Sequence, residues 1–183
     1  MPLQPPSPYT RRDFLRQLAG TATMAGLVGP GLYAARAASG PPLATTRSGR
    51  IAGVVERGIH VFRGVPYGGD TARRRFQRAV REAAWTGTRD AARFGASAPQ
   101  RGDADGQSVS EDCLFLNVYT PALRDGGKRP VLFYIHGGGY NNGSGSHPLY
   151  DGVNLCRRGD VVVVTVNHRL NAFGYLYLGE SGD

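Results

Sequence analysis

The sequence predicts an α/β fold in which a small antiparallel hairpin precedes the first strands of a mostly parallel sheet. Two continuous apolar runs, residues 131–135 and 161–166, are typical of strands buried on both faces. The second run contains four consecutive valines, which a helix tolerates poorly because branching at Cβ restricts the side chain. Residues 149–158 can form a short helix that stops at Gly159. Two buried strands with a helical connection predict a right-handed parallel unit.

Shorter strands are predicted before this unit. Residues 51–55 and 59–62 are strand-like runs, and the three residues Glu56, Arg57 and Gly58 between them suit a hairpin loop. Residues 38–48, rich in Ser, Gly, Pro and Thr, are interpreted as a linker or a first edge strand.

The middle of the chain has less regular patterning. Residues 63–107 contain many Gly and Arg residues and no clear periodicity, so we expect a surface or a functional site there. Residues 114–120 alternate in polarity and end at Pro121, which predicts a further strand. No internal repeat is evident.

The composition bounds the class of protein. The 183 residues suggest one domain, and hydrophobic residues at 40% fit a globular chain. The net charge of +8 comes from 21 Arg and a single Lys. The densest basic group, residues 73–81, has Phe76 as its only aromatic residue and matches no nucleic-acid-binding motif. We therefore interpret it as a solvated basic loop and expect no nucleic acid as a partner.

The N-terminus has the features of an export signal. Arg11 and Arg12 precede residues 17–35, which carry no charge, and residues 35–37 offer a small-x-small cleavage site. Twin arginines before a mildly apolar run indicate the twin-arginine (Tat) export machinery as a partner. We predict a signal peptide over residues 1–37, cleavage near Ala37, and a bacterial periplasmic or secreted product without a stable membrane span. An uncleaved anchor is the alternative.

The run at residues 131–135 ends directly in His136 and the three glycines Gly137, Gly138 and Gly139. Glycines lack a Cβ, so their backbone N–H groups are open to a ligand and can hold a developing negative oxygen. A simple tight turn is the alternative. A phosphate site is excluded, since neither dinucleotide-binding nor P-loop spacing is present.

Several blocks of the sequence together strongly resemble the type-B carboxylesterases, a family that also includes cholinesterases and neuroligins. The resemblance covers residues 43–178. Its motifs are Ser110–Pro121 with its Glu-Asp-Cys-Leu block, Phe62–Tyr67, Arg75-Phe76, the His-Gly-Gly-Gly element, Gly159–Leu170 and Phe173–Leu176.

The resemblance implies an α/β-hydrolase fold, of which residues 38–183 would be the N-terminal portion, and a serine esterase acting on small-molecule esters. It implies that the amides of Gly138 and Gly139 form part of an oxyanion hole, without a metal or organic cofactor. It also implies a buried ion pair between Arg75 and Glu111. Tyr140, Asn141 and Asn142 either line the mouth of the substrate pocket or only shape the turn.

The sequence departs from the family pattern at a few places. Ala98 stands where members usually carry a cysteine bridged to Cys113, so we expect Cys113 and Cys156 to be unpaired. Residues 101–109 contain no aromatic side chain, which argues against choline recognition of the cholinesterase type. Asn171 stands where many members have glycine.

Length is the largest departure. The fold requires a serine in a Gly-x-Ser-x-Gly elbow, then an acid and a histidine. No serine of this chain has both glycines, and the imitation at residues 179–183 ends in Asp183. We expect a truncated gene or a fragment that supplies the oxyanion loop but not the nucleophile, acid or base, and that is inactive alone. The alternative is a non-catalytic binding protein on the same scaffold.

Overall fold

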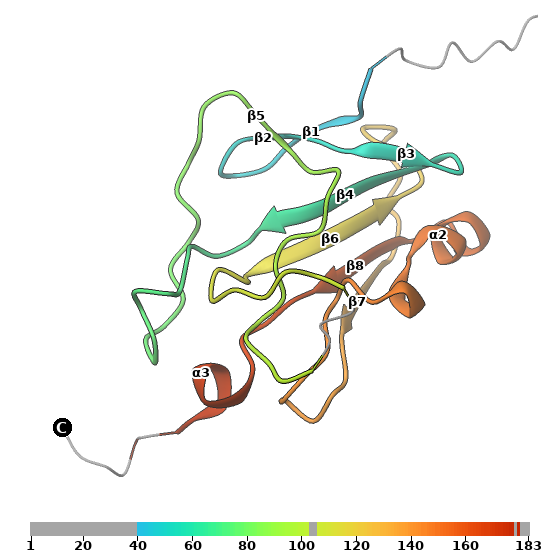
Figure 1. The fold of residues 1–183 in the computed structure, drawn as a ribbon. Coiled ribbons are helices and arrows are strands. Elements are labelled where there is room, and N and C mark those ends of the chain that lie inside the picture. Colours follow the sequence, from blue (N-terminus) through green and yellow to red (C-terminus); the bar gives the residue numbers. More distant parts are fainter. Residues whose placement is uncertain (1–39, 103–105, 178, 180–183) are drawn as a thin grey trace, which may run out of the picture. The chain divides into compact units, whose positions relative to one another are not determined.

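The computed structural model describes residues 40–102, 106–177 and 179, and in these residues the strands form two sheets (Figure 1). The smaller sheet has the order β1-β2-β5, and the larger sheet has the order β3-β4-β6-β8-β7. The strands are β1 Leu43–Thr45, β2 Arg50–Ala52, β3 Val54–Glu56, β4 Ile59–Pro66, β5 Thr88–Asp90, β6 Phe115–Thr120, β7 Val131–Ile135 and β8 Val162–Val166. The helices are the 3-10 helix η1 Pro148–Tyr150 and the α-helices α2 Val153–Gly159 and α3 Asn171–Tyr175.

The predicted signal peptide, with Arg11 and Arg12, lies outside the described residues. Among the residues that are described, no helix has the length and apolar character needed to cross a membrane.

The first predicted strand, residues 51–55, is divided between the two sheets. Ile51 lies in β2, which pairs with β1 and β5, whereas Val55 lies in β3, which pairs with β4. The break falls at Gly53, where any Cβ would overlap the backbone oxygen of Val61. The prediction of a single strand is therefore wrong, because this close approach of two backbones bends the chain from one sheet into the other.

The predicted hairpin is confirmed as the pair β3 and β4, with a shorter loop than expected. Glu56 pairs with Ile59, so the loop contains only Arg57 and Gly58. Their φ values of 49° and 82° are those of a tight hairpin turn whose twist matches the flanking strands. The segment 63–107 also contains more regular structure than predicted, since β4 runs to Pro66 and β5 pairs in parallel with β2.

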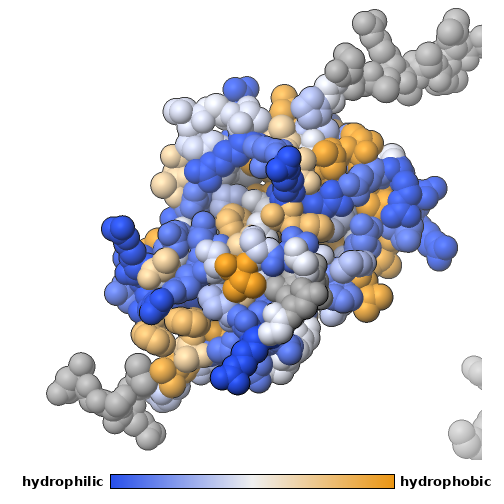
Figure 2. Space-filling model, in the orientation of Figure 1, coloured by the Kyte–Doolittle hydropathy of each residue, from blue (hydrophilic) through white to orange (hydrophobic). Residues whose placement is uncertain are grey.

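In the larger sheet, β3, β4, β6 and β8 are joined by antiparallel pairs, and β7 and β8 form the predicted parallel pair. Strand β8 is at least half-buried along its length. Strand β7, at the edge of the sheet, is mostly exposed, with Phe133 at 56% and Ile135 at 61%. The prediction that this run is buried is wrong for the described residues, because α2 packs against β4, β6 and β8. Figure 2 shows hydrophobic residues reaching the surface between hydrophilic ones.

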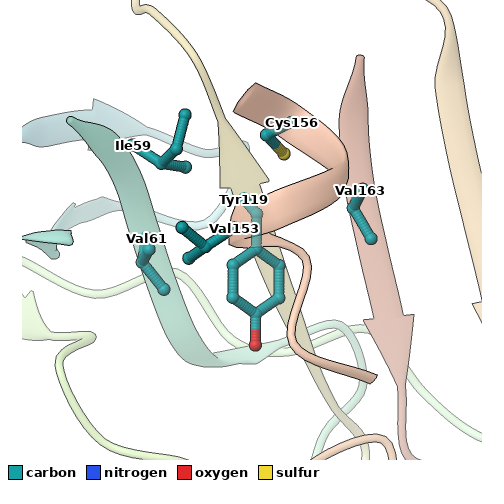
Figure 3. Packing of buried hydrophobic residues seen from close by; sticks show 6 residues of the cluster. All are labelled: Ile59, Val61, Tyr119, Val153, Cys156 and Val163. Atoms are coloured by element: carbon teal, nitrogen blue, oxygen red, sulfur yellow. The ribbon is translucent and has the colours of Figure 1, made fainter. Parts of the chain in front are cut away.

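The main core lies between the sheet and α2. Its six buried members point toward one another from β4, β6, β8 and α2 (Figure 3): Ile59, Val61, Tyr119, Val153, Cys156 and Val163. The crossover helix predicted over residues 149–158 is thus confirmed as η1 followed by α2. The helix ends at Gly159, but the left-handed residue that stops it is Asp160.

A smaller cluster positions the segments around the glycine loop. It contains Ala98, Cys113, Leu114 and Leu170, all buried. Both Cys113 and Cys156 are free thiols, as predicted. Packing against Ala98 thus replaces the covalent link that a second cysteine would give.

Candidate active site at the glycine loop

The glycine loop, residues 136–145, follows the end of β7. Its turn is closed by the amides of Asn141 and Asn142, which donate to the carbonyl oxygen of Gly138 at 3.1 and 3.3 Å. Gly138 has a φ of 116°, and a Cβ there would overlap the backbone oxygen of Asn142. Only glycine fits this position without moving the loop.

The backbone N–H groups of the three glycines determine what the loop can bind. Within the part of the chain that the structure describes, the N–H groups of Gly137, Gly138 and Gly139 donate no hydrogen bond. A Cβ at Gly137 would meet no atom within 4 Å, and one at Gly139 would meet only the amide nitrogen of Asn141, at 3.9 Å. The loop therefore presents unpaired backbone donors at an open surface, which is the requirement for holding an anionic oxygen.

Five hydrogen bonds to Gly143 and Gly145 fix the end of the loop. The Gln100 amide donates to the Gly143 carbonyl at 3.1 Å, and the Gly143 N–H donates back to the Gln100 oxygen at 2.8 Å. The Gly145 N–H donates to the Asn167 side chain at 2.7 Å. The Gly145 carbonyl accepts hydrogen bonds from Asn117 and Thr165, which come from the central strands β6 and β8.

Stacked rings fix the start of the loop. His136 is buried, and its ring lies 4.5 Å from that of His168, with an angle of 10° between the two planes. The hydroxyl of Tyr175 lies 3.1 Å from Nδ1 of His168. His136 Nδ1 lies 2.8 Å from the carbonyl oxygen of Gly137. The first residue of the motif is therefore held in the interior by His168 and fixes the start of the loop.

An open groove of about 430 Å³ lies beside the loop. Its lining residues are Pro99, Gln100, Arg101, Asn141, Asn142, Asn171 and Phe173. Of the three residues expected at a pocket mouth, Asn141 and Asn142 line this groove. Tyr140 is 64% exposed, and its ring packs on Tyr175 at 4.5 Å between centroids.

Arg75 and Glu111 form an ion pair in the structure. Nε of Arg75 donates to both carboxylate oxygens of Glu111, at 3.0 and 2.8 Å, and Nη2 makes a further contact. The hydrogen bonds from Arg75 lower the pKa of Glu111 below its ordinary value. The pair is not buried as expected, since the Arg75 side chain is 55% exposed and that of Glu111 is 17% exposed. Phe173 covers one side of the guanidinium, 5.4 Å from the ring centroid.

Sequence reasoning missed three residues that hold the loop: Gln100, Asn167 and Asn171. Gln100 and Asn167 contact glycines 43 and 22 residues away, which no local pattern reveals. The signal for Asn171 was its departure from glycine. Its φ of 54° lies in the left-handed region, which asparagine tolerates better than most residues. The serine of the imitation elbow, Ser181, lies outside the described residues.

Comparisons with known proteins identify the family of the chain. The model of the Carboxylesterase family matches residues 40–182. The chain is 45% identical to phenmedipham hydrolase of Pseudarthrobacter oxydans, over 74% of this chain and 29% of that protein. It is 38% identical to para-nitrobenzyl esterase of Bacillus subtilis (strain 168), with the same two shares.

A carboxylesterase of Geobacillus stearothermophilus has a similar solved structure. Its TM-score is 0.71 at 46% identity, and the match covers 76% of this chain and 28% of that one. The chain thus spans less than a third of the length of these relatives. With two thirds or more of its own residues matched in each comparison, the chain belongs to the carboxylesterase family and forms part of an α/β-hydrolase fold.

Proposed function

We propose that the polypeptide to which these residues belong is a serine hydrolase of small-molecule carboxylic esters. The observation that carries the proposal is the pair of unpaired amides at Gly138 and Gly139 beside an open groove. Donors held in place before the reaction stabilise charge without reorganising, and one such donor lowers a barrier by about 2.7–4 kcal/mol.

The proposed reaction is acyl transfer in two halves. A serine attacks the ester carbonyl, and the carbonyl oxygen becomes an anion that the two glycine amides hold. A histidine takes the serine proton and gives it to the leaving alcohol, so the acyl group stays on the serine. Water then attacks the acyl-enzyme by the same route and releases the acid. These 183 residues supply the oxyanion loop, whereas the nucleophile, acid and base lie elsewhere in the polypeptide.

The proposal includes export. The twin arginines Arg11 and Arg12 and the uncharged run after them support recognition by the Tat machinery, followed by a periplasmic or secreted location. The Tat route carries folded proteins. A domain whose cysteines are both free can complete its fold before export, since no disulfide has to form afterwards.

The test uses the complete reading frame that contains these codons. We expect the purified polypeptide to hydrolyse 4-nitrophenyl acetate and to contain a Gly-x-Ser-x-Gly elbow. Gly138→Pro removes the amide hydrogen and also forces the backbone away from its φ of 116°, so it is expected to lower kcat/KM by about 100-fold or more. Gly126→Pro is the matched control, because Gly126 also has a positive φ but lies in an exposed turn.

Two results would contradict the proposal. A polypeptide without the elbow and without hydrolysis would favour a binding protein on the same scaffold. Full activity in a folded Gly138→Pro variant would show that the amide of Gly138 does not stabilise the reaction.

A further inference from the structure

We infer that Asn171 is a positioning residue, whose side-chain amide sets the orientation of the Gly138 and Gly139 amides by tying the glycine loop to the segment at Pro99. The inference rests on the ester hydrolase function proposed above. It concerns a residue that contacts the loop from the C-terminal side of the two glycines and does not itself face the reacting atoms.

The backbone of Asn171 makes the first hydrogen bond to the loop. Asn171 opens helix α3, and its N–H donates to the carbonyl oxygen of Tyr140 at 2.8 Å. Asn171 makes this contact in the left-handed conformation, with φ at 54°. Tyr140 directly follows Gly139, so the bond fixes the peptide next to the candidate oxyanion donors.

The side chain of Asn171 makes two more hydrogen bonds. Its Nδ2 donates to the carbonyl oxygen of Asn141 at 3.1 Å and to that of Pro99, also at 3.1 Å. Both hydrogens of the amide are thereby used, and two segments that lie 30 and 72 residues away in the sequence are joined through one nitrogen. Successive carbonyls of the loop, at residues 140 and 141, are therefore held by one residue.

The loop is thus held on both sides of the two glycines. On one side, His136 is stacked against His168. On the other side, Asn171 holds Tyr140 and Asn141, and Gln100 holds Gly143. Asn171 is the member whose loss would free the residues nearest to Gly139, because the Gln100 contact lies four residues further along. An error of 1 Å in the position of a catalytic group can cost about 100-fold in rate, so a looser loop would lower turnover.

The variants separate the side chain from the backbone. Asn171→Gly keeps the left-handed backbone and its N–H, and removes only the two side-chain ties. Asn171→Asp keeps the shape but places a carboxylate against two carbonyl oxygens. Arg124→Gly is the matched control, because Arg124 also has a positive φ, at 56°, in a turn away from the loop.

The experiment uses the complete polypeptide, 4-nitrophenyl butyrate as the substrate and a trifluoromethyl ketone as the probe, since this ketone forms a tetrahedral adduct with a serine. In Asn171→Gly we expect kcat to fall about tenfold with KM unchanged, and the ketone to bind more weakly by a similar factor. The Asp variant should fall further, and Arg124→Gly should match the wild type. A structural role alone would lower the melting temperature without changing the ratio of kcat to KM.

Hydrogen exchange provides a readout that does not need activity. The amides of Asn141 and Asn142, which donate to the carbonyl oxygen of Gly138, should exchange faster in Asn171→Gly than in Arg124→Gly. If the wild type hydrolyses no ester, the proposed function fails, and this exchange still decides whether Asn171 holds the loop. Unchanged exchange, or an active Asn171→Gly enzyme with wild-type kcat and ketone affinity, would overturn the inference.

Discussion

Gln100 and Gly143 hold each other through a pair of opposed hydrogen bonds, in which the side-chain amide imitates the edge of a β-strand. The Gln100 amide nitrogen also donates to the carbonyl oxygen of Ala98 at 3.1 Å. One side chain therefore joins the end of the glycine loop to the buried cluster that contains Ala98 and Cys113. The groove wall and the loop are therefore joined by direct hydrogen bonds.

Replacing Gln100 with alanine should weaken this connection. Three hydrogen bonds are lost, and we expect the free energy of unfolding to fall by about 1–3 kcal/mol. Urea denaturation of the complete polypeptide measures this change. Gln77→Ala is the matched control, because the Gln77 side chain is exposed and its hydrogen bonds with Arg74 and Arg169 are made by backbone groups that alanine keeps. Equal stability of Gln100→Ala and Gln77→Ala would show that the Gln100 hydrogen bonds do not stabilise the fold.

Gly138→Ala should damage the loop more than any other alanine substitution in it. The new methyl group would overlap Asn142, and a φ of 116° is strained for alanine, so we expect a loss of about 2–4 kcal/mol in stability. Thermal unfolding provides the measurement. Gly126→Ala shares the positive φ but meets no atom within 4 Å, and should cost less. A smaller effect at Gly138 than at Gly126 would show that the loop is not held as described.

The Glu56–Arg63 ion pair should make stability depend on pH. Both nitrogens at the end of the guanidinium donate to the carboxylate at 2.7 Å, and these bonds lower the pKa of Glu56 below its ordinary value of 4.5. A lowered acid pKa contributes stability above pH 4.5, and this contribution is lost as pH falls through the folded-state pKa.

Glu56→Gln tests this dependence. The variant should be less stable than the wild type by about 1 kcal/mol near neutral pH, since the carboxylate is partly exposed, and equal to it in strong acid. Melting temperatures at a series of pH values measure the difference. A difference in stability between the wild type and Glu56→Gln that stays constant down to pH 3 would show that the ion pair does not make stability depend on pH.

Cys113 should be unreactive in the folded protein. Burial raises the pKa of its thiol to about 12, and the thiolate is the form that alkylating reagents attack. We expect iodoacetamide at pH 8 to modify Cys113 only after unfolding in urea, as read by mass spectrometry. Because the folded pKa lies above the ordinary value of 9.0, the same burial stabilises the fold up to about pH 9 and loses that effect as pH rises toward 12. Fast modification without urea would contradict the buried position.

The isolated 183-residue chain should associate with itself and show no esterase activity. Strand β7 is an edge strand whose large hydrophobic residues are exposed, and such edges pair with other chains. Light scattering after size exclusion should show oligomers, and Phe133→Lys should reduce them. Leu149→Lys is the matched control, because Leu149 is exposed on η1 and not on the edge. A monomer that hydrolyses 4-nitrophenyl acetate faster than its Gly138→Pro variant would overturn this expectation.

The sequence predicted β7 and β8 because their apolar runs are continuous, and β6 because its residues alternate in polarity and end at Pro121. It predicted the parallel pair β7 and β8 from the helix between them. It could not predict that residues 51–55 divide between two sheets, because the cause is a backbone 8 residues away from Gly53, at Val61. The sequence also could not predict that β7 is exposed, because an apolar run has the same composition in an edge strand and in a buried strand.

For the candidate site, the sequence indicated the glycines but not what holds them. Gly138 and Gly139 form a recognisable block, whereas Gln100, Asn167 and Asn171 reach the loop from distant segments as single polar residues. Their contacts depend on side-chain amides meeting backbone groups across the fold. Local sequence patterns do not reveal contacts between residues that are far apart in the chain.

Both backbone groups of Gly145 are engaged by side chains from the interior, namely Asn167, Asn117 and Thr165. Asn117 also donates to Thr165 at 3.0 Å, so this anchor is a closed network of buried polar groups that cannot easily exchange partners. In the hydrolase proposed above, folding itself would align the oxyanion donors. Each catalytic cycle then begins with the dipoles already in place.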